Sequence, residues 1–127
     1  MQDIRIGTLV PNQNTGDYLR QTLPHGFESF SVMFWQTLAG SDLSRLAEDC
    51  HAALADSDAV ISSLNIYGDA LIDNAEAQET RRGWERLIDA APSFGCDLVT
   101  GSQVVLSMNP SISTVTSYRA RCVCRAG

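Results

Sequence analysis

The sequence predicts an α/β fold in which about four parallel strands alternate with three helices. Short β-rich or apolar runs alternate with amphipathic helical patterns over roughly the first hundred residues. The expected strands begin near residues 4, 29, 59 and 97, at intervals of about 25, 30 and 38 residues, which is the size of right-handed crossover units. The run AVISSL at residues 59–64 is typical of a parallel strand buried on both faces.

The first strand and the first helix are expected within residues 4–26. Residues 4–10 form a β-rich run that ends at Pro11. Pro24 and Gly26 then stop the helix that follows this strand. The face of this helix is formed by Tyr18, Leu19, Thr22 and Leu23, which recur at helical spacing.

The second strand and the second helix follow in residues 27–54. Residues 27–34 predict a strand, because Phe30, Val32 and Phe34 alternate along it. Ser41 suits the N-cap of the next helix. The apolar stripe of that helix consists of Leu43, Leu46, Ala47, Cys50 and Leu54.

The third strand, residues 59–64, is expected to end in a polar, Gly-containing loop that begins at Asn65. The longest helix should cover residues 75–91, and Pro92 and Gly95 should end it. A fourth strand, residues 96–100, closes on Gly101. The apolar face of the long helix is expected to contain Trp84, Leu87, Ile88 and Ala91.

Two folds match this alternation: a doubly wound open sheet and a (β/α)8 barrel, the TIM barrel. A dinucleotide-binding sheet usually has a Gly-rich phosphate turn after its first strand. Here the corresponding segment is VPNQNTGDY, with one glycine. The sequence therefore favours an incomplete (β/α)8 barrel in residues 1–101, since about 250 residues are typical of a whole one. Residues 102–127 contain no Asp or Glu and no helical stripe, and are expected to form an irregular tail.

Composition excludes several classes of function. The net charge of −6 disfavours nucleic acid and anionic membranes as partners. No apolar run approaches the roughly 18 residues that span a bilayer, and the N-terminus lacks a signal-peptide pattern, so the expected location is the cytoplasm. His25 and His51 are expected to lie away from any site. Cys50 and Cys96 are expected to be small core residues. The spacing of these two and of the other two cysteines, Cys122 and Cys124, predicts neither a metal site nor a disulfide framework.

Two blocks, AVISSLNIYGDAL and RRGWERLIDAAPSFGCDLVTG, resemble the third and fourth strands of the sugar phosphate isomerase/epimerase family. These proteins are xylose isomerase-like TIM barrels. In this family the third strand commonly ends in a serine-leucine run, which is followed by tyrosine-glycine-asparagine and a leucine. Here these positions are Ser63 with Leu64, Tyr67 with Gly68, and Leu71, while Asp69 replaces the asparagine. The resemblance covers roughly residues 3–101.

The resemblance implies metal-assisted proton transfer next to a carbonyl of a small sugar or sugar phosphate. The divalent metal of the family (Mn, Mg, Co or Zn) is held by residues of later strands, which this chain does not contain. This chain is therefore expected to be inactive alone. It would contribute substrate contacts from Trp35, Asn65, Tyr67 and Asp69 at the strand ends. The alternatives at these positions are plain packing for Trp35 and Tyr67, and a capped turn for Asp69.

Three further expectations accompany this interpretation. The segment SQVVLSMNPSI can be read one nucleotide out of frame as FAGRPVDEPVD, which continues the family pattern, so residues 102–127 are hypothesised to be frameshifted. A half barrel would expose the edges of its first and fourth strands, which predicts homo-oligomers. Arg81 and Arg82 are expected to pair with Glu79 or Glu85, with phosphate binding as the alternative.

The alternative function is a non-catalytic α/β domain that associates through its open sheet edge.

Overall fold

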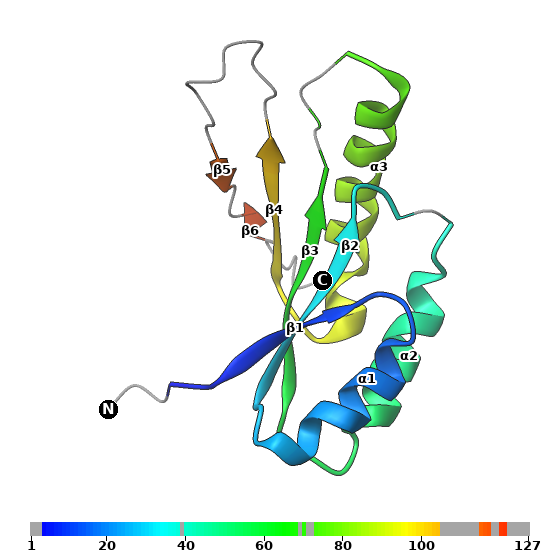
Figure 1. Ribbon diagram of the computed structural model, residues 1–127. Coiled ribbons are helices and arrows are strands. Elements are labelled where there is room, and N and C mark those ends of the chain that lie inside the picture. The colour runs from blue at the N-terminus through cyan, green and yellow to red at the C-terminus, as the bar shows by residue number, and fades with distance from the viewer. Residues whose placement is uncertain are drawn as a thin grey trace.

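Four parallel strands form one sheet in the same order in which they occur along the chain (Figure 1). They are β1 (Gly7–Pro11), β2 (Ser29–Trp35), β3 (Val60–Tyr67) and β4 (Leu98–Val104). The structure is a computed structural model, and it describes residues 4–38, 40–68, 70, 73–104, 115–117 and 120–121. The predicted α/β class, with four parallel strands and three helices, is confirmed.

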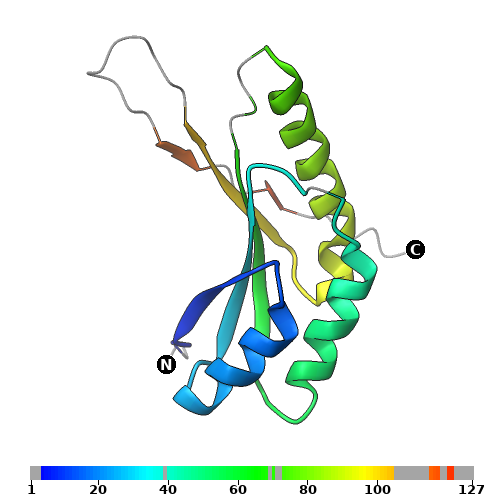
Figure 2. The ribbon, with the colours of Figure 1, turned by 45° about the vertical axis from the view of Figure 1, so that its right-hand side comes forward.

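The three helices, α1 (Thr15–Thr22), α2 (Leu43–Leu54) and α3 (Ala75–Ala90), cover the same side of the sheet (Figure 2). Each connection leads to the next strand in the same direction, and right-handed crossovers in one direction place every helix on one face. Short 3₁₀ helices, η1 (Leu23–His25) and η2 (Ala91–Phe94), follow α1 and α3. Gly26 (φ 87°) and Gly95 (φ 75°) end them in the left-handed region, at the predicted stops.

The core lies between the sheet and the helices. Along β2, Phe30, Val32 and Phe34 are fully buried beneath the helices, as their alternation predicted. The helices contribute buried apolar side chains to the same core, including Leu19, Ala47, Cys50 and Leu87. No helix of the described residues covers the opposite face, which we call the helix-free face. Its residues include Leu9, Ser31, Met33, Trp35, Ser63, Asn65, Tyr67 and Thr100, which share register rows.

Several predicted boundaries were wrong because long-range pairing overrides local preference. Asn65 and Tyr67 belong to β3 and not to a loop, since β2 pairs with β3 as far as Trp35 and Tyr67. Strand β4 continues past Gly101 to Val104. The N-cap of α2 is Asp42, whose carboxylate accepts a hydrogen bond from the Arg45 amide at 3.1 Å. The Ser41 hydroxyl instead donates to the Leu38 carbonyl.

The face of α1 differs in part from the expectation, because Leu19 is buried but Tyr18 is 41% exposed. The predicted apolar face of the long helix is confirmed, since Leu87 and Ala91 are buried and the half-buried Trp84 and Ile88 pack against the core. The small residues of α3 lie closest to the sheet, and they are Ala77, Thr80 and Gly83. Their size lets the helix approach the strands closely, a feature that an apolar stripe alone does not reveal.

The two sheet edges differ. The outer edge of β4 pairs antiparallel with β5 (Val115–Ser117) and β6 (Ala120–Arg121), so the expected exposed edge at the fourth strand is wrong. Strand β1 pairs only with β2 within the described residues.

The frameshift hypothesis concerns residues that mostly lie outside the described part of the chain. No helix in that part is both long and apolar enough to cross a membrane.

The Cys50 thiol is buried in the core, and the predicted role of Cys50 and Cys96 as buried small residues is confirmed. Burial, with a smaller contribution from the Asp49 carboxylate, raises the pKa of Cys50 from 9.0 to about 12. The folded chain therefore keeps this proton to higher pH than the unfolded chain does. The resulting stabilisation is complete below about pH 9 and is lost as the pH rises toward about 12.

We expect the free energy of unfolding to fall less steeply with pH in Cys50→Ala than in the wild-type protein. Urea unfolding at several values between about pH 8 and pH 11 measures both slopes. Cys50→Ala will be less stable at every pH because it leaves a small cavity, so the slopes and not the absolute values are compared. Equal slopes would show that Cys50 does not govern alkaline stability.

Candidate functional site

The carboxyl ends of β2 and β3 bring together two of the predicted site residues. Trp35 and Tyr67 are register partners, and the Gln36 amide extends the pairing by donating to the Tyr67 carbonyl at 2.8 Å. Trp35 is 68% exposed on the helix-free face, so it does not pack as a core residue. Tyr67 is half-buried beside it. An aromatic ring and a phenol at adjacent strand ends can contact a small polar ligand from one side. Asp69 lies outside the described residues.

Asn65 occupies a different environment from the one predicted. It is 3% exposed, and its amide lies in a hydrogen-bonded row across three strands. Asn65 Nδ2 donates to Ser31 Oγ, and Thr100 Oγ1 donates to Asn65 Oδ1. The Ser31 hydroxyl also contacts the Ser63 hydroxyl. Because Ser31 and Thr100 engage the amide of Asn65 from both sides, this side chain connects the three strands near Trp35 and Tyr67.

Ser31, Ser63 and Thr100 were not predicted from the sequence as members of this polar row. A usable signal was present in the second strand, where Ser31 alternates with the buried residues Phe30 and Val32. Because side chains alternate between the two faces of a strand, Ser31 must lie on the face away from Phe30 and Val32. The partners of Ser31 could not be identified, because they follow from the pairing registers of β2 with β3 and β3 with β4.

A double-mutant cycle tests this row. Asn65→Ala and Thr100→Val should each lower the free energy of unfolding by about 1–3 kcal/mol, because each leaves a polar partner unsatisfied. The double variant should lose less than the sum, with a coupling energy of about 0.5 kcal/mol or more. Chemical denaturation of the four proteins gives this energy. Strict additivity would mean that the two side chains do not interact.

The loops at this end of the sheet are held by α3. Thr80, fully buried, donates from its hydroxyl to the Gln36 carbonyl at 2.9 Å. Gln36 has a φ of 59°, so this bond secures a residue in the left-handed region. A Cβ on Gly68 would lie 2.6 Å from both the Gln36 carbonyl oxygen and Thr80 Oγ1. The ends of β2 and β3 are therefore locked together where Trp35 and Tyr67 lie.

Two predicted arginine pairings have different outcomes. Arg82 forms an ion pair with Glu79 at 2.6 Å, as expected. Arg81 instead donates to the Ala70 carbonyl at 2.7 Å, so it stabilises the connection between β3 and α3. The expected pairing of Arg81 with a glutamate was wrong because the neighbouring loop supplies a closer acceptor.

Candidate metal ligands do not gather within the described part of the chain. No three side chains of His, Cys, Asp or Glu lie close enough there to hold a metal ion. His51 is on the exposed side of α2, and its Nε2 lies 2.6 Å from the Ser93 carbonyl oxygen. His25 is in η1, at the amino end of β2.

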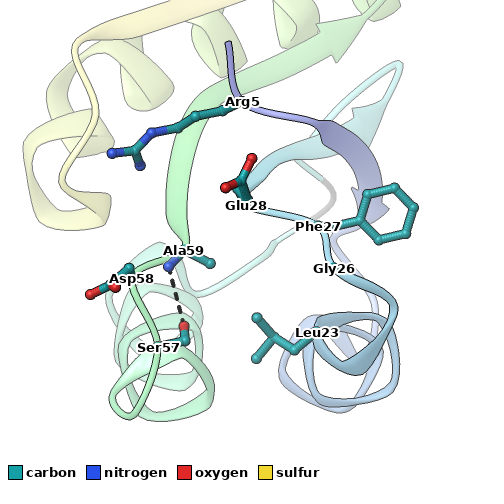
Figure 3. Close-up of a pocket in the computed structure, with 8 residues that line it drawn as sticks. All are labelled: Arg5, Leu23, Gly26, Phe27, Glu28, Ser57, Asp58 and Ala59. Carbon is teal, nitrogen blue, oxygen red and sulfur yellow. Dashed lines mark hydrogen bonds between the residues drawn. The ribbon is translucent and has the colours of Figure 1, made fainter. Parts of the chain in front are cut away.

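A recess opens at the opposite, amino end of the strands (Figure 3). Its volume is about 690 Å³, and charged residues from three different segments line it, namely Arg5, Glu28 and Asp58. This recess was not predicted from the sequence. Its residues come from the segment before β1 and from the connections that lead into β2 and β3, and no local motif links them.

Comparison of the chain with protein-family models, curated proteins and solved structures finds no match. Assignment of a function therefore rests on the residues and the geometry described above.

Proposed function

We propose that this chain is the N-terminal part of a (β/α)8 barrel of the sugar phosphate isomerase/epimerase type. The observation that supports this proposal is the arrangement of the sheet. Four parallel strands follow in sequential order, and all three helices cover one face. A doubly wound sheet would reverse its strand order and place helices on both faces, whereas a barrel keeps one helix-covered and one helix-free face.

In this proposal the helix-free face is part of the barrel interior. Trp35 and Tyr67 lie at the carboxyl ends of their strands, which is the end where (β/α)8 barrels bind substrates. The indole ring of Trp35 would contact the apolar side of a sugar, and the Tyr67 hydroxyl would hydrogen-bond to a sugar hydroxyl. The polar row beneath them would keep this end of the sheet rigid.

The proposed parent reaction is proton transfer next to a carbonyl, with a divalent metal stabilising the developing negative charge. The described residues do not fit such a metal, because they offer no cluster of three suitable ligands. We therefore assign no catalytic step to this part of the chain. Its role would be to bind substrate, and it should show no turnover when isolated.

Tryptophan fluorescence tests the binding step. The chain has two tryptophans, so Trp84→Phe leaves Trp35 as the only reporter. Titration of this variant with aldose and ketose phosphates should quench the emission in a saturable manner. Tyr67→Ala should weaken binding by about tenfold, which corresponds to the loss of one hydrogen bond with its ring contact. Tyr18→Ala, which removes an exposed tyrosine on α1, is the matched control. No saturable change up to about 10 mM sugar phosphate would contradict the proposal.

A second candidate function is a non-catalytic domain that associates through an open edge. The outer edge of β1 supports this alternative, because no other described strand pairs with it. Leu9 in β1 is exposed, as are Ile4 and Ile6 just before it. Edge pairing would give a homodimer whose population rises with concentration, and Leu9→Lys should disperse it. Sedimentation of both proteins over a range of concentrations distinguishes this alternative, since a monomer throughout would rule it out.

A further inference from the structure

The recess at the amino end of the sheet is built from three segments that backbone hydrogen bonds join. The Glu28 amide donates to the Ile6 carbonyl at 2.8 Å, and the Val60 amide donates to the Glu28 carbonyl at 3.1 Å. These bonds tie the lead-in to β1, the turn before β2 and the turn before β3 into one unit. The walls of the recess are therefore largely formed before any ligand arrives.

The acidic groups of the recess are also oriented. Glu28 Oε2 accepts a hydrogen bond from the Ile6 amide at 3.2 Å, so one carboxylate oxygen is engaged and the other stays available. The Ser57 hydroxyl donates to the Leu54 carbonyl at 3.1 Å and accepts from the Ala59 amide at 3.3 Å. This serine fixes the turn that presents Asp58, whose carboxylate makes no hydrogen bond within the described residues.

Arg5 supplies the opposite charge. Its side chain lines the recess, and Figure 3 shows it extending over the same space that Glu28 and the turn at Asp58 border. In the described part of the chain the Arg5 guanidinium forms neither an ion pair nor a hydrogen bond. One cation without a partner among the described residues and two carboxylates therefore line the same recess. The side chains of Leu23 and Ala59 give the recess an apolar side.

We propose that this recess binds a zwitterionic α-amino acid with an apolar side chain. Arg5 would hold the carboxylate in a two-pronged hydrogen bond, and Asp58 and Glu28 would hold the ammonium group. A simple anion would be repelled by the two carboxylates, and a simple cation by Arg5, whereas a zwitterion complements both charges. Leu23 and Ala59 would contact its side chain. The volume of about 690 Å³ is in the range of small-molecule sites and accommodates such a ligand.

This site is separate from the sugar site of the proposed function. The recess lies at the amino ends of the strands, and Trp35 and Tyr67 lie at the carboxyl ends. Either proposal can therefore fail without the other, and Trp35→Ala should leave amino-acid binding unchanged.

Titration of the full chain with leucine or phenylalanine, followed by amide chemical shifts in NMR spectra, tests the proposal. We expect saturable shifts at the recess, in residues 26–28 and 57–59. Arg5→Gln and Asp58→Asn should each weaken binding by about tenfold or more, because each removes a charge-assisted hydrogen bond. Arg45→Gln and Asp73→Asn are matched controls, since both residues are exposed and lie outside the recess.

Ligand analogues keep the test informative even if a variant folds poorly. Leucinamide lacks the carboxylate and N-acetylleucine lacks the ammonium group, so both should bind the wild-type protein at least about tenfold more weakly than leucine. Glycine should also bind more weakly, because it lacks the apolar side chain. If either leucine analogue binds as tightly as leucine, the zwitterion proposal is overturned. Absence of saturable shifts up to about 10 mM leucine or phenylalanine overturns it as well.

Discussion

Replacing Phe34 with alanine should lower the free energy of unfolding by about 3–5 kcal/mol, whereas Trp35→Ala should change it by less than about 0.5 kcal/mol. The two residues are neighbours on β2 and point to opposite faces of the sheet. Phe34 is 0% exposed beneath the helices, and Trp35 is 68% exposed on the helix-free face. Truncating Phe34 leaves a cavity in a close-packed core, while truncating Trp35 removes a ring that already lies largely in solvent.

Urea unfolding followed by circular dichroism measures both changes. A domain of this size is typically stable by about 5–15 kcal/mol, so Phe34→Ala could leave little folded protein. Phe34→Leu is therefore included, and it should cost less than Phe34→Ala because it leaves a smaller cavity. Equal losses for Phe34→Ala and Trp35→Ala would mean that both faces of β2 are packed, which would contradict the one-sided core.

The second large effect is expected at Gly68. Replacing Gly68 with alanine should lower the free energy of unfolding by about 2–4 kcal/mol, from overpacking together with loss of one buried hydrogen bond. The new Cβ would lie 2.6 Å from the Gln36 carbonyl oxygen and from Thr80 Oγ1, and 2.8 Å from Thr80 Cγ2. One of these contacts is backbone and the others belong to a fully buried side chain, so none can move freely.

Gly16→Ala is the matched control for this prediction. The nearest atom to a Cβ at Gly16 is Arg20 Nη1 at 3.3 Å, at the end of a flexible side chain, and the next is the Asp49 carbonyl oxygen at 3.5 Å. Gly16 lies in the first turn of α1, where alanine favours the helix by up to about 1 kcal/mol. Gly16→Ala should therefore be neutral or stabilising. If Gly68→Ala is equally harmless, the close contact between α3 and the two strand ends is not real.

Loss of the Gly68 contacts should also affect the candidate sugar site. The bond from Thr80 to the Gln36 carbonyl holds the residue that directly follows Trp35, and Gly68 directly follows Tyr67. A shift of either loop would separate the indole ring from the phenol. We therefore expect Gly68→Ala to weaken any sugar phosphate binding under conditions where the variant is still folded.

Much of the fold follows from local patterns. Periods of two and of about three and a half residues identified β2 and α2, because burial of one face selects side chains at those spacings. Cys50 and Leu54 are buried as the stripe of α2 predicted. The stops at Gly26 and Gly95 were also predictable, because both adopt a positive φ that other residues rarely tolerate.

The candidate site was less predictable than the fold. Asn65 and Tyr67 were both assigned to the loop after the third strand, because asparagine and the glycine that follows Tyr67 favour turns. Their neighbours on β2 and β4 hold them in an extended strand instead. The N-cap of α2 was assigned to Ser41 and not to Asp42, because both residue types are good caps and only the backbone geometry separates them.

The sequence by itself determined the α/β class, the positions of the three helices and most of the residues that face the core. These properties depend on spacing along the chain, and hydrophobic burial acts on that spacing directly. Only the tertiary structure decided that Ser31, Asn65 and Thr100 meet in one row, and that Arg5 and Asp58 border one recess. Such contacts join residues more than 30 positions apart, and they follow from strand register and crossover geometry, for which no local pattern carries the information.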